Sequence, residues 1–147
     1  MIVPSAVLKF SLFHGLTEEQ AENIIPLMVQ EEYNPDEIII TEGKSNDKIY
    51  FIVKGKVTAT KRNTLLSYFC EGDSFGEMEV LDVMPANATI KAFSPVVVMA
   101  ISNKALRTIY NIDVKTFSLL ILNIARDFSR RLRKMDEKLA SSPPIFI

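Results

Sequence analysis

Residues 29–101 carry apolar side chains at alternate positions, and this period of two constrains the fold more than any other feature of the chain. Ile49, Phe51 and Val53, for example, share one side of a short segment that Gly55 ends. Turn residues interrupt the pattern roughly every eight to ten positions. Many short, evenly spaced antiparallel strands are typical of closed sheets, so the sequence predicts a mainly β fold: a jelly-roll barrel, or double-stranded β-helix.

Helical patterns flank this segment on both sides. Thr17-Glu18-Glu19-Gln20 is a capping box that starts a helix, and Pro26 should kink or end that helix. Ser102 caps a second helix, and a longer third helix follows it. The expected bounds are about 17–28, 102–110 and 114–140 for the helices, about 29–101 for the barrel, 1–140 for the domain and 141–147 for a tail.

Composition bounds the class of protein. The 147 residues are 48% hydrophobic and carry a net charge of −1, which provides enough apolar material for one core. This charge gives no reason to expect nucleic acid or an anionic membrane as a partner, and no apolar run approaches the roughly 18 residues that span a bilayer. Cys70 is the only cysteine, so we expect a cytoplasmic protein without an internal disulfide, with Cys70 buried on a strand.

The segment Phe75-Gly76-Glu77-Met78, followed by Pro85-Ala86-Asn87-Ala88-Thr89, has the features of a phosphate-binding turn. A glycine before a short helical run leaves the first backbone amides unpaired, and phosphate oxygens can bind there. Gly76 lets a ligand approach the backbone closely. The Glu77 carboxylate can accept hydrogen bonds from two neighbouring ribose hydroxyls.

Charge in this region opposes an anion. No Lys or Arg occurs between Arg62 and Lys91. Five acidic residues lie there instead: Glu71, Asp73, Glu77, Glu79 and Asp82. Unless a basic residue arrives from elsewhere in the fold, an anion is repelled. The alternative interpretation is that these carboxylates lie on a solvated loop and a short exposed helix.

The last helix carries an apolar seam with alternating steps of four and three residues. The seam residues are Ile121, Ala125, Phe128, Leu132, Met135 and Leu139. This spacing is that of a coiled coil and indicates a homodimer through the helix, while the alternative is that the seam packs on the barrel. Basic residues on the same helix alternate with acids, so we interpret them as a solvated flank and expect no nucleic acid to bind there.

Catalysis has little support in the sequence. His14 is the only histidine, so neither a histidine metal cluster nor a triad with a histidine base can form. We therefore expect no enzymatic activity, no metal and no required cofactor.

Several segments together resemble the cyclic-nucleotide-binding domains of the Crp/Fnr regulators, the group of the catabolite activator protein. The resemblance is carried by residues 49–57 (Ile-Tyr-Phe-Ile-Val-Lys-Gly-Lys-Val), residues 66–69 (Leu-Ser-Tyr-Phe), Gly72-Asp73 and Phe75-Gly76-Glu77. The order of helix, barrel and two helices agrees with it. Such regulators usually continue into a helix-turn-helix domain that reads DNA, and this sequence ends first, so we expect a stand-alone sensor domain.

The resemblance implies which residues would contact a nucleotide. Gly76, Glu77 and the Met78 amide would meet the ribose and phosphate. The remaining implied contacts are Asn87 and Ala88 on the phosphate side beside Ala86, Ala59 and Leu66 as the apolar wall of the base pocket, and Met135 and Asp136 over the base. The family usually has an arginine at the position of Ala86, and losing such a charge-assisted hydrogen bond costs about 1.5–3 kcal/mol, or roughly 10- to 150-fold in affinity.

Two hypotheses follow from these observations. In the first, the chain is a regulatory sensor that binds cyclic AMP, cyclic GMP or a related small molecule weakly or with altered selectivity, and a shift of the last helix signals to a partner, such as a separate output protein. In the second, the pocket no longer binds a ligand and the helix seam serves as a dimerisation or protein-interaction surface.

Overall fold

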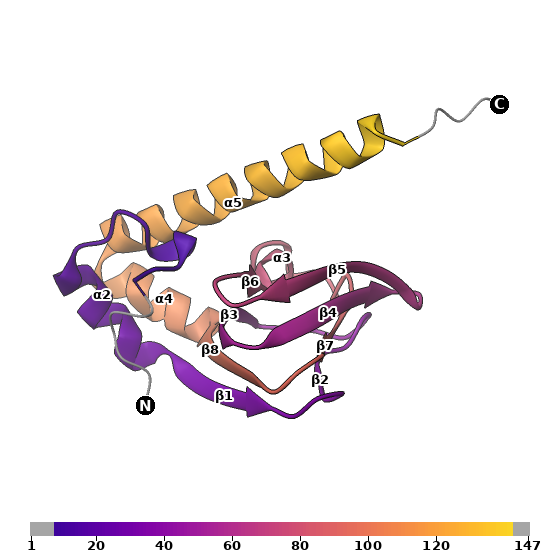
Figure 1. The fold of residues 1–147 in the computed structure, drawn as a ribbon. Coiled ribbons are helices and arrows are strands. Elements are labelled where there is room, and N and C mark those ends of the chain that lie inside the picture. The colour runs from indigo at the N-terminus through magenta and orange to yellow at the C-terminus, as the bar shows by residue number, and fades with distance from the viewer. Residues whose placement is uncertain (1–7, 143–147) are drawn as a thin grey trace.

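The computed structural model describes residues 8–142, which form a β barrel with helices before and after it (Figure 1). The strands are β1 (Val29–Tyr33), β2 (Ile38–Ile40), β3 (Lys48–Lys54), β4 (Lys56–Lys61), β5 (Thr64–Cys70), β6 (Ser74–Phe75), β7 (Thr89–Ala92) and β8 (Val96–Ser102). They pair antiparallel in two four-stranded sheets, with the orders β1-β8-β3-β6 and β2-β7-β4-β5. This arrangement confirms the predicted fold class, although the two-residue strand β6 is too short to show a periodicity.

Strands β3 and β8 are buried on both faces, because one face lines the barrel and the other meets the helices. Ile52 and Val98 are paired across the two strands and lie in the apolar cluster inside the barrel. Phe51 and Met99 are also paired, and they lie in a second cluster together with the helices. The period of two therefore divides the apolar residues between two cores.

The segment before the barrel contains the short 3₁₀ helix η1 (Ser11–Phe13), the helix α2 (Glu18–Ile24) and a 3₁₀ turn, η2 (Ile25–Leu27). The predicted capping box is present, since the Thr17 side chain accepts from the Gln20 amide and the Gln20 side chain accepts from the Thr17 amide. Pro26 lies inside η2, so the α-helical geometry ends directly before it, as expected from its missing amide hydrogen.

Three helices follow in the chain: α3 (Glu77–Asp82), α4 (Asn103–Ile112) and α5 (Val114–Ala140). Helix α4 begins after the Ser102 cap and ends two residues later than expected, whereas α5 covers the residues that its pattern predicts. Asn123 is buried on α5, and its Nδ2 atom donates to the carbonyl oxygens of Leu12 at 2.8 Å and His14 at 2.9 Å. These bonds fix the first half of α5 to η1.

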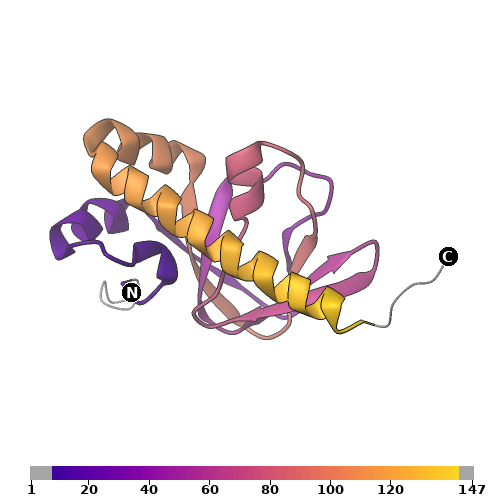
Figure 2. The same cartoon turned by 90° about the horizontal axis from the view of Figure 1, so that it is seen from above.

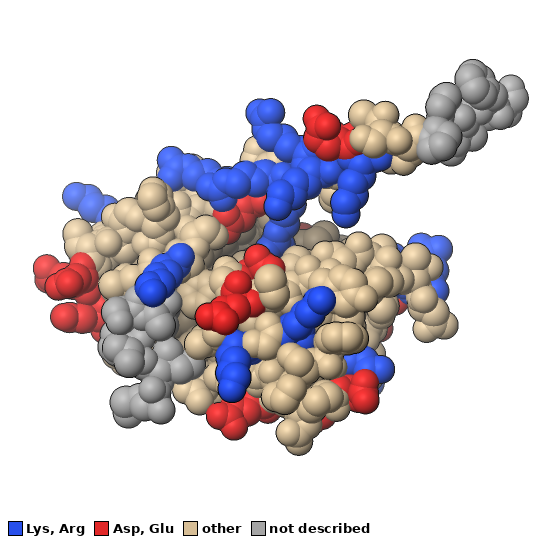
Figure 3. Space-filling view, viewed as in Figure 1, with Lys and Arg blue, Asp and Glu red and all other residues tan. Residues whose placement is uncertain are grey.

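The second half of α5 extends across the barrel (Figure 2). Of the seam residues, Ile121 and Phe128 pack against the chain's own helical core, whereas Leu132, Met135 and Leu139 are 59%, 59% and 73% exposed. Lys and Arg side chains gather along this helix (Figure 3). In the first half of the seam, Ile121 and Phe128 are therefore used within the chain while Ala125 is exposed, and the second half is left open to solvent.

Some features of the surface bear on the remaining expectations. Cys70 is exposed at the end of β5, so the expectation that it is buried is wrong; it shares the exposed side of this strand with Tyr68. Among residues 8–142, none of the helices combines the length and the apolar character needed to cross a bilayer. Residues 143–147 of the predicted tail lie outside the described part of the chain.

Candidate functional site

The predicted site is built on the connection between β6 and β7, which contains α3 and which we call the cassette (residues 76–88). Gly76 begins it with a φ of +89°, and a Cβ atom at this position would lie 2.5 Å from the Lys48 carbonyl oxygen. Only glycine fits such a backbone without displacing β3. No side chain caps α3, and within residues 8–142 the amides of Glu77 and Met78 have no hydrogen-bond acceptor.

Glu77 is 5% exposed, and its carboxylate is held by two groups. The Ser74 hydroxyl donates to Oε1, and Nη1 of Arg131 lies 3.5 Å from Oε2. Arg131 also donates through Nη2 to the Ser74 carbonyl oxygen at 2.7 Å, and its guanidinium lies 5.4 Å from the centre of the Phe69 ring. A basic residue thus does arrive from elsewhere in the fold, and it comes from α5.

Sequence reasoning missed Arg131, although a signal for it exists. Arg131 precedes Met135 by four positions on the same helix, so the two side chains share one face of α5. A helix expected to place Met135 over the site should also bring Arg131 near it. Asp136 lies one position further, about 100° around the helix from Met135, and is exposed.

Glu79 is the second buried carboxylate of the cassette, at 9% exposure. Its Oε1 atom lies 3.4 Å from Nδ2 of Asn46, an amide that also donates to the carbonyl oxygens of Lys48 and Gly76. Burial raises the pKa of Glu79 above its usual range, and hydrogen bonds from Asn46 and the Asn87 amide offset part of that rise. The interpretation of these acids as a solvated run is therefore wrong for Glu77 and Glu79, because both side chains are buried.

Ala86 lies inside the barrel at 4% exposure, within the same apolar cluster as Phe75 and Ala59. Its backbone is fixed by two hydrogen bonds to the turn after β2: the Gly43 amide donates to the Ala86 oxygen at 2.9 Å, and the Ala86 amide donates to the Lys44 oxygen at 2.7 Å. A longer side chain at this position would therefore project into the barrel.

The remaining predicted residues are less enclosed. The Asn87 side chain is exposed and accepts from Nζ of Lys61 at 2.7 Å, while Ala88 is half-buried. Met78 is 45% exposed. Across β4 and β5, Ala59 pairs with Ser67, and a register shift follows this pair; Leu66 is 46% exposed. Of the predicted residues, Ala59 and Ala86 thus lie in the apolar cluster of the barrel, whereas Glu77 is buried against Ser74 and Arg131.

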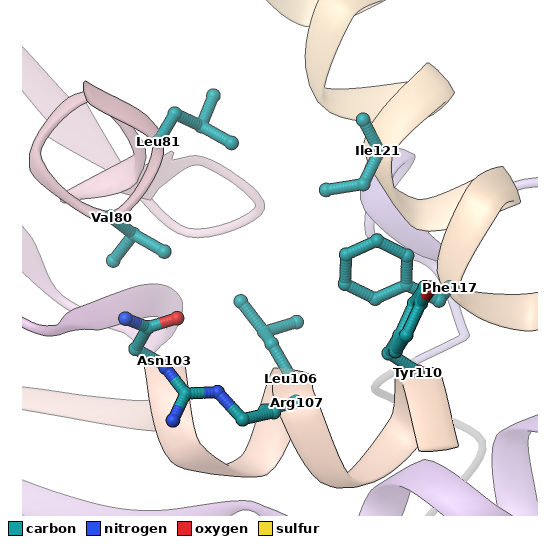
Figure 4. A pocket seen from close by; sticks show the side chains of 8 residues that line it. All are labelled: Val80, Leu81, Asn103, Leu106, Arg107, Tyr110, Phe117 and Ile121. Carbon is teal, nitrogen blue, oxygen red and sulfur yellow. The ribbon is translucent and has the colours of Figure 1, made fainter. Parts of the chain in front are cut away.

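A separate cavity of about 220 Å³ lies between α3, α4 and α5 (Figure 4). Leu81 on α3 and Ile121 on α5 point into it from opposite sides, and Leu106 and Tyr110 of α4 lie below them. None of the residues predicted to bind a ligand lines it. Within residues 8–142, no three His, Cys, Asp or Glu side chains come close enough together to hold a metal ion.

Comparison with known proteins places this geometry in context. Residues 30–113 match the family described as the cyclic nucleotide-binding domain. A cGMP-dependent protein kinase of Eimeria tenella is 31% identical over 111 residues, which cover 75% of this chain and 11% of the kinase. The chain spans about a third or less of the length of the curated relatives it matches.

Solved structures show the same fold. A cyclic nucleotide-binding domain from Methylobacillus flagellatus superposes with a TM-score of 0.85 at 22% identity, covering 99% of this chain and 85% of the other. The catabolite activator protein of Thermus thermophilus superposes with a TM-score of 0.75 at 25% identity, covering 88% of this chain and 62% of the other.

Proposed function

This chain belongs to the cyclic nucleotide-binding domain family, and from that premise we propose that it is a non-catalytic regulatory domain that senses a small ligand in the cassette. In this proposal Gly76, Glu77 and the Met78 amide meet the ribose side of the ligand. Ala59, Ala86, Asn87, Ala88 and Leu66 surround the rest of it, and Met135 and Asp136 approach from α5.

The contact between Arg131 and Glu77 is the observation that carries this proposal. The Glu77 carboxylate has a limited number of acceptor positions, and Ser74 and Arg131 already use some of them. A ligand whose hydroxyls donate to Glu77 competes with Arg131 for these positions. Binding would therefore change how firmly α5 is held against the barrel, which converts occupancy of the cassette into a movement of the last helix.

The cavity between α3 and α5 supports such a movement. An open space of this size leaves room for α3 and α5 to change their separation without a steric clash. Leu81 and Ile121 line that space from the two helices, so the distance between them can change when the cassette is filled.

Cyclic nucleotides are expected to bind weakly or with altered selectivity. Ala86 supplies no cation, and its surroundings inside the barrel are apolar. Without a charge-assisted contact to the phosphate, the affinity falls by roughly 10- to 150-fold relative to a site that has one.

The partner in this proposal is a second copy of the chain. Leu132 and Leu139 are exposed on the second half of α5, and a homodimer through this helix would bury them. A separate output protein would then read the position of α5. We propose the cytoplasm as the location, because the chain has one cysteine and needs no disulfide.

A second candidate function rests on the same exposed residues. If the cassette no longer binds a ligand, the open half of the α5 seam would serve only as an interaction surface. The two functions differ in one respect: the sensor requires a ligand that displaces Arg131, and the interaction module does not.

Calorimetric titration with cyclic AMP, cyclic GMP and their nucleosides tests the sensor, with hydrogen exchange of residues 126–140 as the readout of coupling. The sensor predicts that at least one ligand binds and changes exchange in α5, and that Glu77→Ala weakens this binding by about tenfold or more. Glu71→Ala, which removes an exposed acid outside α3, serves as the control. Absence of binding by every ligand, with Ala86→Arg also inactive, would favour the interaction module.

A further inference from the structure

The cassette contains two buried carboxylates, and a cation pairs with one of them. Glu77 and Glu79 are both more than nine-tenths buried, although they lie only two positions apart on α3. Arg131 pairs with Glu77. Glu79 has no Lys or Arg nitrogen within 4.0 Å among residues 8–142, and its neighbours are the neutral groups of Asn46 and Asn87.

Glu79 occupies the side of the cassette on which an anion would need to bind. Its carboxylate lies 3.4 Å from the Asn46 side chain, in the turn before β3, and near the backbone of Asn87, which follows Ala86. A ligand phosphate placed beside Asn87 would meet this buried carboxylate, and the two anions would repel each other in a partly desolvated site.

Lys61 is a second cation whose side chain contacts this loop, and its position limits what it can do. Its Nζ atom donates to the side-chain oxygen of Asn87, an exposed residue, so the ammonium lies on the solvent side of the loop. A strongly hydrated charge at that position is screened by water and offsets little of the repulsion from a buried carboxylate.

A ligand with hydroxyl groups has the opposite relation to these carboxylates. Ribose hydroxyls donate hydrogen bonds, and ionised carboxylates only accept them. Hydrogen bonds from a hydroxyl to a charged acceptor are among the stronger ones, provided the ligand brings no negative charge of its own.

We propose that Glu79 makes the cassette selective for a neutral nucleoside over a cyclic nucleotide, because its carboxylate accepts ligand hydroxyls where a phosphate would be repelled. This inference rests on the proposed function, since it names the class of ligand that the same site senses. Glu77 then accepts from one part of the ribose and Glu79 from another, while Arg131, the cation that reaches the cassette from α5, is already paired with Glu77.

The test compares two matched pairs of probes by calorimetry at neutral pH: adenosine with cyclic AMP, and guanosine with cyclic GMP. For at least one pair, the wild type should bind the nucleoside at least about tenfold more tightly than the cyclic nucleotide. Glu79→Gln keeps the size of the side chain and removes its charge, so it should raise the cyclic nucleotide affinity by at least about tenfold and narrow or reverse the preference.

Three controls make the comparison specific. Glu71→Gln removes an exposed acid that lies outside α3 and should leave the preference unchanged. Lys61→Gln tests the remaining cation and should change nucleoside binding less than about threefold. Thermal unfolding of each variant establishes that it is folded, and Glu79→Ala provides a second substitution if the glutamine variant is not.

The outcomes separate the inference from the proposed function. Tighter binding of the cyclic nucleotide by the wild type, with no effect of Glu79→Gln, would overturn the selectivity inference and leave a ligand sensor in place. Binding of no probe by the wild type and the Glu79 variants would overturn both. If the preference for the nucleoside disappears in Lys61→Gln but persists in Glu79→Gln, the assignment of selectivity to Glu79 is overturned.

Discussion

The guanidinium of Arg131 lies 3.5 Å from the carboxylate of Glu77, which is 54 positions earlier in the chain. This contact joins the last helix to the first residue of α3. It also places a cation of α5 at the one carboxylate that the family resemblance assigns to the ribose.

Arg131→Ala should destabilise the protein by about 1–2 kcal/mol, because it leaves the buried Glu77 carboxylate with only the Ser74 hydroxyl. Arg130→Ala is the matched control, since Arg130 is an exposed arginine that pairs with Asp127 on its own helix; its cost should stay below about 1 kcal/mol. Urea unfolding of the two variants measures the difference. Equal costs would mean that the contact with Glu77 adds nothing to stability.

Gly76→Ala should cost about 2–5 kcal/mol in the free energy of unfolding. About 1–2 kcal/mol comes from the positive φ, and the remainder from the clash of the new methyl with the Lys48 carbonyl oxygen, 2.5 Å away. Gly72 has a similar φ of +94° and open space around it, so Gly72→Ala should cost only the strain, about 1–2 kcal/mol. If Gly76→Ala and Gly72→Ala destabilise the protein equally in thermal unfolding, the close approach of β3 is not the reason that position 76 requires glycine.

Val83→Gly should stabilise the protein by about 0.5–1 kcal/mol. Val83 ends α3 with a φ of +58°, which is strained for a β-branched residue, and it is 82% exposed, so little packing is lost. The gain is reduced by the greater freedom of glycine in the unfolded chain. Val114→Gly, at an exposed position in the first turn of α5, should instead destabilise the protein. Calorimetric melting temperatures of the two variants give the comparison.

Leu132→Glu should convert a dimer of this chain into a monomer, with a rise of at least about 100-fold in the dissociation constant, because the new charge would be buried between two copies of α5. Light scattering coupled to size exclusion measures the mass. Ile112→Glu adds the same charge at an exposed apolar residue of α4 and should leave the mass unchanged. A wild-type protein that is monomeric at high concentration contradicts pairing through α5.

The free energy of unfolding of the wild type should depend on pH through Glu79, and Glu79→Gln should remove this contribution. Burial raises the folded-state pKa of Glu79 above the value of 4.5 expected in the unfolded chain, so the ionised form destabilises the folded protein above that raised pKa. As the pH falls through the folded pKa toward 4.5, the penalty disappears and the wild type gains stability relative to Glu79→Gln. Urea unfolding of both proteins at about pH 7.5, 6 and 5 tests this sign. A difference that stays constant or reverses over this range would contradict the buried state of the ionised carboxyl.

Local features of the fold could be predicted from sequence. The Thr17 capping box, the break at Pro26 and the start of α4 after Ser102 depend on residues within one turn of each other, so their physical causes are visible in a short window. The barrel follows from the period of two, which requires only that alternate side chains be apolar. The boundaries of α5 follow from its helical period in the same way.

The cassette could be predicted only in part. Gly76 and Glu77 are recognisable from their spacing, but Asn46, Lys61 and Arg131 reach the cassette from the turn before β3, from β4 and from α5. The spacing of four between Arg131 and Met135 shows that the two share a face of α5, but it does not show which acid that face meets. The burial of Glu79 is equally invisible in a window, because an acid on a short helix is usually exposed.

Sequence patterns therefore established the order of the elements, their caps and the alternation that divides the apolar residues between the barrel and the helices. The three-dimensional arrangement decided which carboxylates lost their water, which cation met Glu77 and which half of the α5 seam remained exposed. The reason is that caps and periodicities act between residues close in the chain, whereas desolvation and charge pairing depend on neighbours that only packing brings together.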